Sequence, residues 1–327
     1  MVSLTRMLTF VALCLASRLA YSFNDLFTGR LARREGRVEV AALRGASLAV
    51  SMAPLLLWVP SESFGRLGRF GGELALTCAL TAASNVLQLE AARFLPFGAR
   101  AALIVGGVSG GSLLLGWLLS GEVLAATDVA LGLLVMTSAV AASGGAHATN
   151  EIDPNPGKGA LLSLGSAALA AIVSWEVQNL ARRSNALLVA WAWEGGSGLV
   201  LLGPLLLWPG VAQRLCSARR FMRIALASLP TVVGSGASVL ALSYGELGLW
   251  GAFAGTQILF TVALGTLLHR ERLGALRAVC FALAAGAIAA LALRRVPGSA
   301  SQQSQVNPSA LVYPGYSSVA FPRAPAA

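Results

Sequence analysis

The sequence has little charge. Only 12% of its 327 residues are Asp, Glu, Lys or Arg, whereas 56% are hydrophobic, and the mean hydropathy is +0.71. Soluble domains carry about a quarter charged residues. The chain is long enough to bury a large soluble core, but it lacks the charged residues to cover one. The composition therefore predicts a polytopic membrane protein with an all-α fold.

The sequence also lacks the residue clusters from which catalytic and metal sites are built. It has no nucleophile elbow, HExxH pattern or phosphate-binding loop. Its two histidines are far apart, and its four cysteines have neither metal-site nor disulfide spacing: Cys14, Cys78, Cys216 and Cys280. An enzyme is therefore not expected, and neither is a cofactor or a metal ion.

The net charge of +10 comes almost entirely from arginine, because Lys158 is the single lysine. Two interpretations remain open. Arginines in loops orient helices across a membrane, and arginines around a cavity bind an anionic substrate. No feature of the sequence indicates a nucleic-acid partner. The expected partners are the lipid bilayer and a small anionic solute, with a homodimer left open.

A helix crosses the hydrocarbon core with about 20 apolar residues. Apolar windows of this kind predict ten transmembrane helices, at about 7–27, 39–59, 71–94, 97–119, 125–143, 159–180, 186–208, 222–243, 247–269 and 274–293. The first 17 residues also fit a cleaved signal peptide. The apolar pattern continues beyond them to Leu26, which favours a retained first helix.

A polar segment at 144–158 divides the chain in two. Its Asn, Asp, Pro and Gly residues are typical of a loop. We therefore expect one set of five helices in residues 1–143 and a second set in 159–295. Residues 296–327 are rich in Pro, Ser and Gln, which predicts a disordered tail.

A short duplication relates the two halves. LGWLLSGEVL at 115–124 and LGTLLHRERL at 264–273 share six of ten residues, among them Glu122 and Glu271. Five crossings separate the copies, and because five is odd, equivalent helices run in opposite directions. This predicts an inverted-topology repeat, a common architecture of alternating-access transporters. Both glutamates lie at a junction between helices, where a carboxylate is stabilised by a helix N-terminus, so we expect a structural role for them.

Ionisable groups at membrane depth are functional candidates, because burying them in hydrocarbon is unfavourable. Arg18, Tyr21, Ser22 and Asp25 share one face of the first expected helix. Glu194 lies in the middle of the seventh, and Arg18 is its most attractive partner. The alternatives are an ion pair that only locks the packing and a polar wall of a substrate cavity.

Four uncharged polar residues are further candidates for substrate binding. Asn85 and Gln88 lie one turn apart in the third expected helix, and Thr256 and Gln257 lie in the ninth. Hydrogen bonds between helices are an equally good explanation for each pair. Glu90 and Arg93, at the end of the third helix, have the spacing of an ion pair.

One stretch resembles a known family. SNVLQLEAARFLPF at 84–97 is similar to the end of the third helix of nucleotide-sugar transporters, in the branch that carries UDP-galactose and 3′-phosphoadenylyl sulfate. Glu194 and Ser197 fall at that branch's N-x-x-S pattern in helix 7. Tyr21, Asn24 and Asp25 fall at its Y-G-x-x-Q-E pattern. Ten helices with a Glu-x-Leu pattern after the fourth and ninth resemble the wider drug/metabolite transporter superfamily.

This resemblance implies a nucleotide-sugar or activated-sulfate antiporter of the Golgi or endoplasmic reticulum membrane. The family has both termini in the cytosol, whereas the arginines of this chain are more frequent in the odd-numbered links, which predicts the reverse. Ile104 stands where the family has a phosphate-binding lysine, and Thr256 and Gln257 stand where its ninth helix has a cation. Arg100 and Arg18 are candidate replacements, and a carrier of a less charged solute or a non-transporting scaffold remains an alternative.

Overall fold

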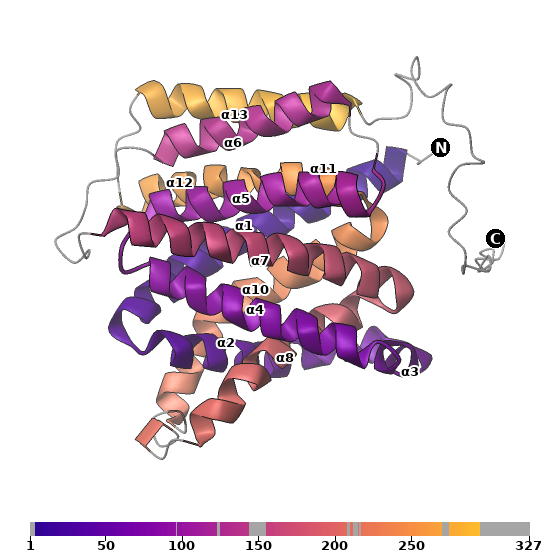
Figure 1. Cartoon of the computed structure of the whole chain (residues 1–327), viewed down its shortest axis with the longest axis vertical. Helices are drawn as coiled ribbons and strands as arrows, with labels where there is room; N and C mark the ends of the chain where they lie inside the picture. The colour runs from indigo at the N-terminus through magenta and orange to yellow at the C-terminus, as the bar shows by residue number, and fades with distance from the viewer. Residues whose placement is uncertain are drawn as a thin grey trace.

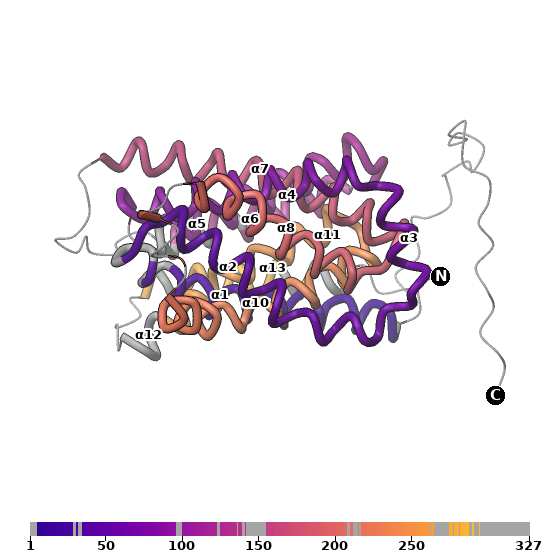
Figure 2. Tube along the Cα trace, turned by 90° about the horizontal axis from the view of Figure 1, so that it is seen from below, coloured from indigo at the N-terminus to yellow at the C-terminus, as the bar shows by residue number. Residues whose placement is uncertain are grey.

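The computed structural model describes residues 4–95, 97–122, 125–143, 155–207, 210–211, 215, 217–269 and 275–294. These residues form helices and no strand. In chain order the helices are α1 Leu4–Arg34, α2 Arg37–Met52, the 3-10 helix η1 Ala53–Trp58, α3 Glu62–Gly68, α4 Gly71–Ala91, α5 Phe97–Leu119, α6 Ala126–Ser143, α7 Pro156–Arg183, α8 Ala186–Leu206, α10 Ala218–Tyr244, α11 Leu247–Ala254, α12 Thr256–His269 and α13 Ala275–Arg294. Most of them run along one common direction (Figure 1, Figure 2).

Within the described residues, seven helices are long and apolar enough to cross a membrane: Thr5–Thr28, Arg37–Trp58, Gly71–Ala91, Arg100–Leu119, Pro156–Arg183, Ala186–Leu206 and Ala218–Tyr244. Three shorter apolar helices cover Ala126–Val135, Leu247–Thr261 and Ala278–Ala287. Large apolar side chains such as Leu57, Leu161 and Leu199 are exposed on the outside, where lipid would cover them. The chain is therefore a multi-pass membrane protein.

Every apolar window of the sequence overlaps a helix, but three details differ from the expectation. The ninth window is divided at Gly255 into α11 and α12. A β-carbon at Gly255 would lie 2.1 Å from Cγ1 of Val135, so α6 approaches the backbone closely at this point. The end of the second window is the 3-10 helix η1, and the link after it holds a short helix, α3, that was not predicted. The last residues of the expected loop at 144–158 are helical, because α7 begins at Pro156.

Local sequence explains where several helices begin. The side chain of Asn155 accepts a hydrogen bond from the backbone N–H of Lys158 at the start of α7, and Pro156 occupies the first turn. Asn185 accepts from Leu187 and Leu188 at the start of α8. These side chains satisfy backbone donors that have no partner within the helix.

The helices pack in corresponding pairs when the first five long segments (α1, α2, α4, α5, α6) are matched in order with the second five (α7, α8, α10, α11–α12, α13). The contact of α1 with α10 corresponds to that of α7 with α4, and the contact of α2 with α10 to that of α8 with α4. In three further contacts a helix packs against its own counterpart in the other half: α2 with α8, α5 with α11, and α6 with α13. The last pair lies side by side at one edge of the bundle (Figure 1).

Small residues allow the closest of these contacts. A β-carbon at Gly45 of α2 would lie 2.4 Å from the Cα of Gly198 in α8, so the two backbones touch. Gly107 and Gly111 of α5 lie against the methyl groups of Ala167 and Ala171 in α7. Gly107 and Gly111 thus let α5 and α7 approach closely.

Candidate functional site

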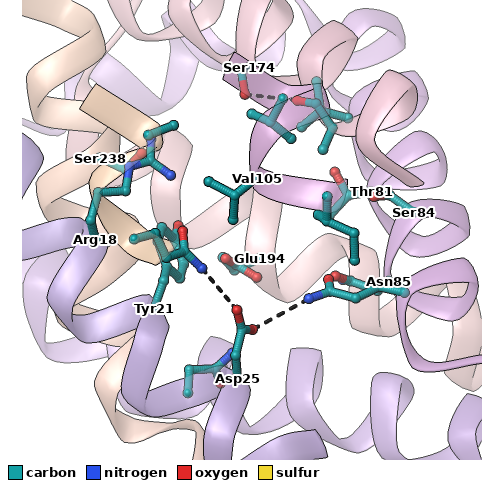
Figure 3. A pocket seen from close by; sticks show the side chains of 18 of the residues that line it. Arg18, Tyr21, Asp25, Thr81, Ser84, Asn85, Val105, Ser174, Glu194 and Ser238 are labelled. Atoms are coloured by element: carbon teal, nitrogen blue, oxygen red, sulfur yellow. Dashed lines mark hydrogen bonds between the residues drawn. The ribbon is translucent and has the colours of Figure 1, made fainter. Parts of the chain in front are cut away.

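A cavity of about 170 Å³ lies in the middle of the bundle. Its wall comes from α1, α2, α4, α5, α7, α8, α10, α11 and α12, which means that both halves of the chain contribute. Most of the lining is apolar, but five ionisable groups other than tyrosine face it: Arg18, Asp25, Arg44, Arg100 and Glu194. Figure 3 shows Arg18, Tyr21 and Asp25 on one side of this space, with Glu194 between them and Asn85.

Arg18 lies near the centre of the first span and is only 4% exposed. Its guanidinium carbon is 4.1 Å from the ring centroid of Trp250 and 5.8 Å from that of Tyr21. The indole N–H of Trp250 donates to Oγ of Ser238 at 3.2 Å, which fixes the ring. Among the described residues, Nε and Nη2 of Arg18 have no hydrogen-bond partner.

Glu194 is held by groups other than the one expected. Oγ of Ser235 donates to its Oε1 at 2.5 Å, and Nη2 of Arg44 lies 3.6 Å from its Oε2. The hydroxyl of Tyr21 lies 2.9 Å from Oγ of Ser235 and extends this network. The expected pair of Arg18 with Glu194 is therefore wrong in this structure, since Arg44 occupies that place.

Arg44 is not among the residues predicted to bind substrate, although the sequence holds a signal for it. Arg44 is the only ionisable residue between Glu39 and Glu62 and lies within the second expected helix. The reasoning that singled out Arg18 applies equally to it. Its side chain is 11% exposed, and the Glu194 side chain 2%, so this ion pair is buried.

Asp25 is the centre of a second group of hydrogen-bonded polar residues in the cavity wall. Nε2 of Gln257 donates to its Oδ2 at 2.9 Å, and Nε2 of Gln88 lies 3.4 Å from its Oδ1. Arg100, 3% exposed, donates through Nη1 to the backbone carbonyl of Gln88 at 3.2 Å. The structure thus brings together residues of the first, third, fourth and ninth expected helices.

Seven of the eight residues singled out for substrate binding line the cavity: Arg18, Tyr21, Asn85, Gln88, Arg100, Glu194 and Gln257. Thr256 does not; its hydroxyl donates to the backbone carbonyl of Phe253 at 2.8 Å, one turn earlier in the chain. Ile104, at the position of the family's lysine, also lines the cavity. The expected pair of Glu90 with Arg93 is present at 3.2 Å.

Glu122 has a structural role of an unexpected kind. Its carboxylate accepts hydrogen bonds from the backbone N–H groups of Leu247 at 2.5 Å and Gly248 at 2.8 Å, at the N-terminus of α11. It therefore caps a helix of the other half rather than α6, which follows it in the chain. Burial raises the pKa of Glu122 above its usual range, although the two N–H donors act in the opposite direction. Glu271, the duplicate residue, lies outside the described residues.

Two groups of ion pairs join the halves away from the cavity. Arg220, the third residue of α10, pairs with Glu35 and Glu39, each at 2.5 Å. Arg183 pairs with Glu73, the third residue of α4, at 3.0 Å. When the two sets of five helices are matched in order, α10 corresponds to α4, so Arg220 and Glu73 occupy equivalent positions.

The two groups of ion pairs lie at opposite ends of the bundle. The first is at the start of α2, and α2 leads from there toward the end of the bundle that holds the second.

No protein-family model and no curated protein matches the sequence. Solved structures do resemble the fold, with 28 matching chains. One of them, described only as the crystal structure of a protein, is 16% identical, with a TM-score of 0.64 over 86% of this chain and 98% of that chain. A likeness at this level of identity concerns the fold alone. Within the described residues, no group of three His, Cys, Asp or Glu side chains could hold a metal ion.

Proposed function

We propose that the protein is a secondary-active carrier that moves an anionic organic solute across a membrane by alternating access. The observation that carries the proposal is the central cavity, in which five ionisable side chains from both halves are buried within apolar candidate spans. Such groups are expensive to bury in hydrocarbon and typically line a substrate or ion pathway.

The proposal includes ten membrane spans arranged as two inverted sets of five. The corresponding helix contacts support this arrangement, since a two-fold relation between the halves makes each contact occur twice or match itself. In the same matching, Glu73 and Arg220 are each the third residue of their helix, and each pairs with a residue of the other half, which is consistent with this arrangement. Secondary carriers built in this way bind substrate at the interface of the repeats, near the bilayer midplane.

Alternating access requires contacts that close each end of the cavity in turn. The two groups of ion pairs, at opposite ends of the bundle, provide contacts of that kind. The side chains of Arg220 and Glu35 are 11% and 12% exposed, whereas those of Arg183 and Glu73 are 35% and 43% exposed. The end with Arg220 is thus the more tightly closed in this conformation.

The substrate class that we propose is a nucleotide sugar or a related nucleotide, exchanged in the Golgi or endoplasmic reticulum membrane. Support comes from the motif at 84–97, whose Asn85 and Gln88 line the cavity. Small-molecule sites usually enclose about 300–1,000 Å³, so the present cavity of about 170 Å³ is too small for a whole nucleotide sugar. The two halves must separate at one end to admit it.

A less charged solute is the second candidate. Ile104 and Thr256 stand at the positions where the family has cations, and Ile104 lines the cavity. Asp25 and Glu194 offset two of the three arginines. A site with this balance has little excess charge for a nucleoside diphosphate group.

The test is counterflow in liposomes that contain the purified full-length chain. Liposomes are loaded with one compound of a panel of nucleotides, nucleotide sugars and neutral metabolites, and uptake of the labelled compound is followed. Exchange of nucleotides supports the first candidate, and exchange of neutral metabolites alone supports the second. Absence of exchange across the panel, with protein of verified fold, rejects the carrier and favours a non-transporting scaffold.

A further inference from the structure

We infer that Arg18, seated on the face of Trp250, is the anion-binding subsite of the central cavity and takes one oxyanion group of the ligand. A carboxylate, a sulfate ester and a single phosphoryl group share this chemistry. The inference rests on the proposed function, because it assigns a ligand group to the same cavity.

The charges of the cavity leave Arg18 without a counterion. Three arginines and two carboxylates line the space, so one positive charge is in excess when all five are ionised. Glu194 is engaged by Arg44 and Ser235. Asp25 is engaged by Gln257 and Gln88. Both carboxylates therefore have other partners, and Arg18 has no carboxylate partner within the described part of the chain.

Two of the three side-chain nitrogens of Arg18 are also without a hydrogen-bond partner among the described residues. Nε and Nη2 are buried and have no partner among the described residues, although buried polar groups are normally hydrogen-bonded. These two atoms form one edge of the planar guanidinium fork, and that fork matches the two oxygens of a carboxylate or phosphoryl group. An oxyanion bound at this edge supplies both the missing charge and the missing acceptors.

Trp250 holds the guanidinium group in place before any ligand binds. The distance of 4.1 Å from the guanidinium carbon to the ring centroid is that of a close cation–π contact. Because the ring face covers one side of the guanidinium plane, an acceptor has to approach in that plane, at the edge that carries the N–H groups. The bond from the indole to Ser238 keeps the ring itself from turning. A group positioned in advance loses less conformational freedom when it binds.

The same cavity indicates what the rest of the ligand carries. Asp25 lies two turns from Arg18 on the same face of α1, roughly 10 Å along the helix axis. Asn85, Gln88 and the Asp25 carboxylate provide hydrogen-bond acceptors at that end. The ligand class is therefore an anion with N–H or O–H donors about 10 Å from its charged group.

The experiment uses matched compounds that differ in one anionic group. Dissociation constants for the purified full-length protein are measured by calorimetry for glucose against glucuronate, glucose against glucose 6-sulfate, and uridine against uridine 5′-monophosphate. We expect the anion of at least one pair to bind tenfold or more tightly than its neutral partner. The pair that shows this preference distinguishes carboxylate, sulfate and phosphoryl recognition.

Two variants then locate the preference. Arg18→Gln should remove it, and Arg18→Lys should keep part of it, because lysine retains the charge but not the planar fork. Arg66→Gln is the control, since Arg66 pairs with Glu62 on the surface at 52% side-chain exposure. If Arg18→Gln does not fold, the test compares Arg18→Lys with Arg66→Gln. We then expect Arg18→Lys to prefer the anion over its neutral partner by a smaller factor than Arg66→Gln does.

Two results overturn the inference. One is an Arg18→Gln or Arg18→Lys variant that discriminates anions as well as the wild type does. The other is a wild type that prefers no anion in any pair. Both leave the carrier open, because counterflow of a neutral solute would still show transport.

Discussion

Removal of the Glu122 carboxylate tests how the two halves are joined. Glu122 follows α5, yet its two oxygens accept the first backbone N–H groups of α11. Glu122→Ala leaves these donors without their acceptors and removes a negative charge from the positive end of that helix. We expect the variant to fold into the same structure with lower stability.

The magnitude follows from the two hydrogen bonds. A hydrogen bond to a charged group contributes about 1.5–3 kcal/mol, so two of them give roughly 3–6 kcal/mol. Glu122 is only partly buried, and water replaces part of this loss. We therefore expect Glu122→Ala to lower the free energy of unfolding by about 2–4 kcal/mol, and Glu122→Gln, which keeps one neutral acceptor, by about 1–2 kcal/mol.

The assay is chemical unfolding of the purified protein in mixed micelles at neutral pH. Glu62→Ala is the control, because it removes a carboxylate from a surface pair and should change the free energy by less than about 1 kcal/mol. If Glu122→Ala and Glu62→Ala were equally stable, the cap would contribute nothing and the reasoning would be refuted.

The same residue predicts a pH dependence with a definite sign. The pKa of Glu122 is raised in the folded protein, so the folded state holds the proton more tightly than the unfolded state does. The stability that this tighter proton binding contributes is fully present below the ordinary pKa of glutamate, and it is lost as the pH rises through the raised pKa of Glu122. The stability difference between wild type and Glu122→Gln should fall across this window and stay constant above it. A difference that rises with pH would contradict the assigned shift.

Three further predictions concern packing and charge. Gly198→Ala should lower the unfolding free energy by about 1–3 kcal/mol, because the new methyl group meets the backbone of Gly45, whereas Gly203→Ala, with open space around it, should change it by less than about 0.5 kcal/mol. Arg44→Met should lower the unfolding free energy by about 3–5 kcal/mol, because it leaves Glu194 unpaired in the interior. The double variant Arg44→Met/Glu194→Leu should recover most of this loss in the same unfolding assay; a double variant no more stable than Arg44→Met would show that the two residues are not coupled. Reversing one charge, as in Glu73→Arg, should slow counterflow, and the swap Glu73→Arg/Arg183→Glu should restore it; a swap as slow as the single variant would show that this pair has no role in closing the cavity.

The positions of the helices were predictable because long apolar windows leave a chain few alternatives in a membrane. The same logic identified Arg18, Asn85, Gln88, Glu194 and Gln257 as inward-facing polar residues, and all five line the cavity. Each was recognised from its own position in an apolar helix, with no knowledge of its neighbours.

The partners of these residues were not predictable. Whether Glu194 meets Arg18 or Arg44 depends on how α2 packs against α8, and the close approach at Gly45 and Gly198 decides that. The target of Glu122 is likewise a helix more than a hundred residues later in the chain. Thr256 was predicted to face the cavity but does not. A polar side chain in a span can instead form a hydrogen bond with the backbone of its own chain one turn away.

The most direct test of a cavity that opens to each face in turn is the accessibility of two cysteines. Leu89 and Leu242 both line the cavity, close to the ends of α4 and α10, which we place at opposite faces of the membrane. Leu89→Cys and Leu242→Cys are introduced separately into a chain in which Cys14, Cys78, Cys216 and Cys280 are replaced by serine. A membrane-impermeant maleimide is then applied to each side of the vesicles. We expect the two thiols to react from opposite sides, with a transported solute increasing one reaction while it decreases the other. Reaction of both thiols from the same side, or rates that no exchanged solute alters, would contradict alternating access.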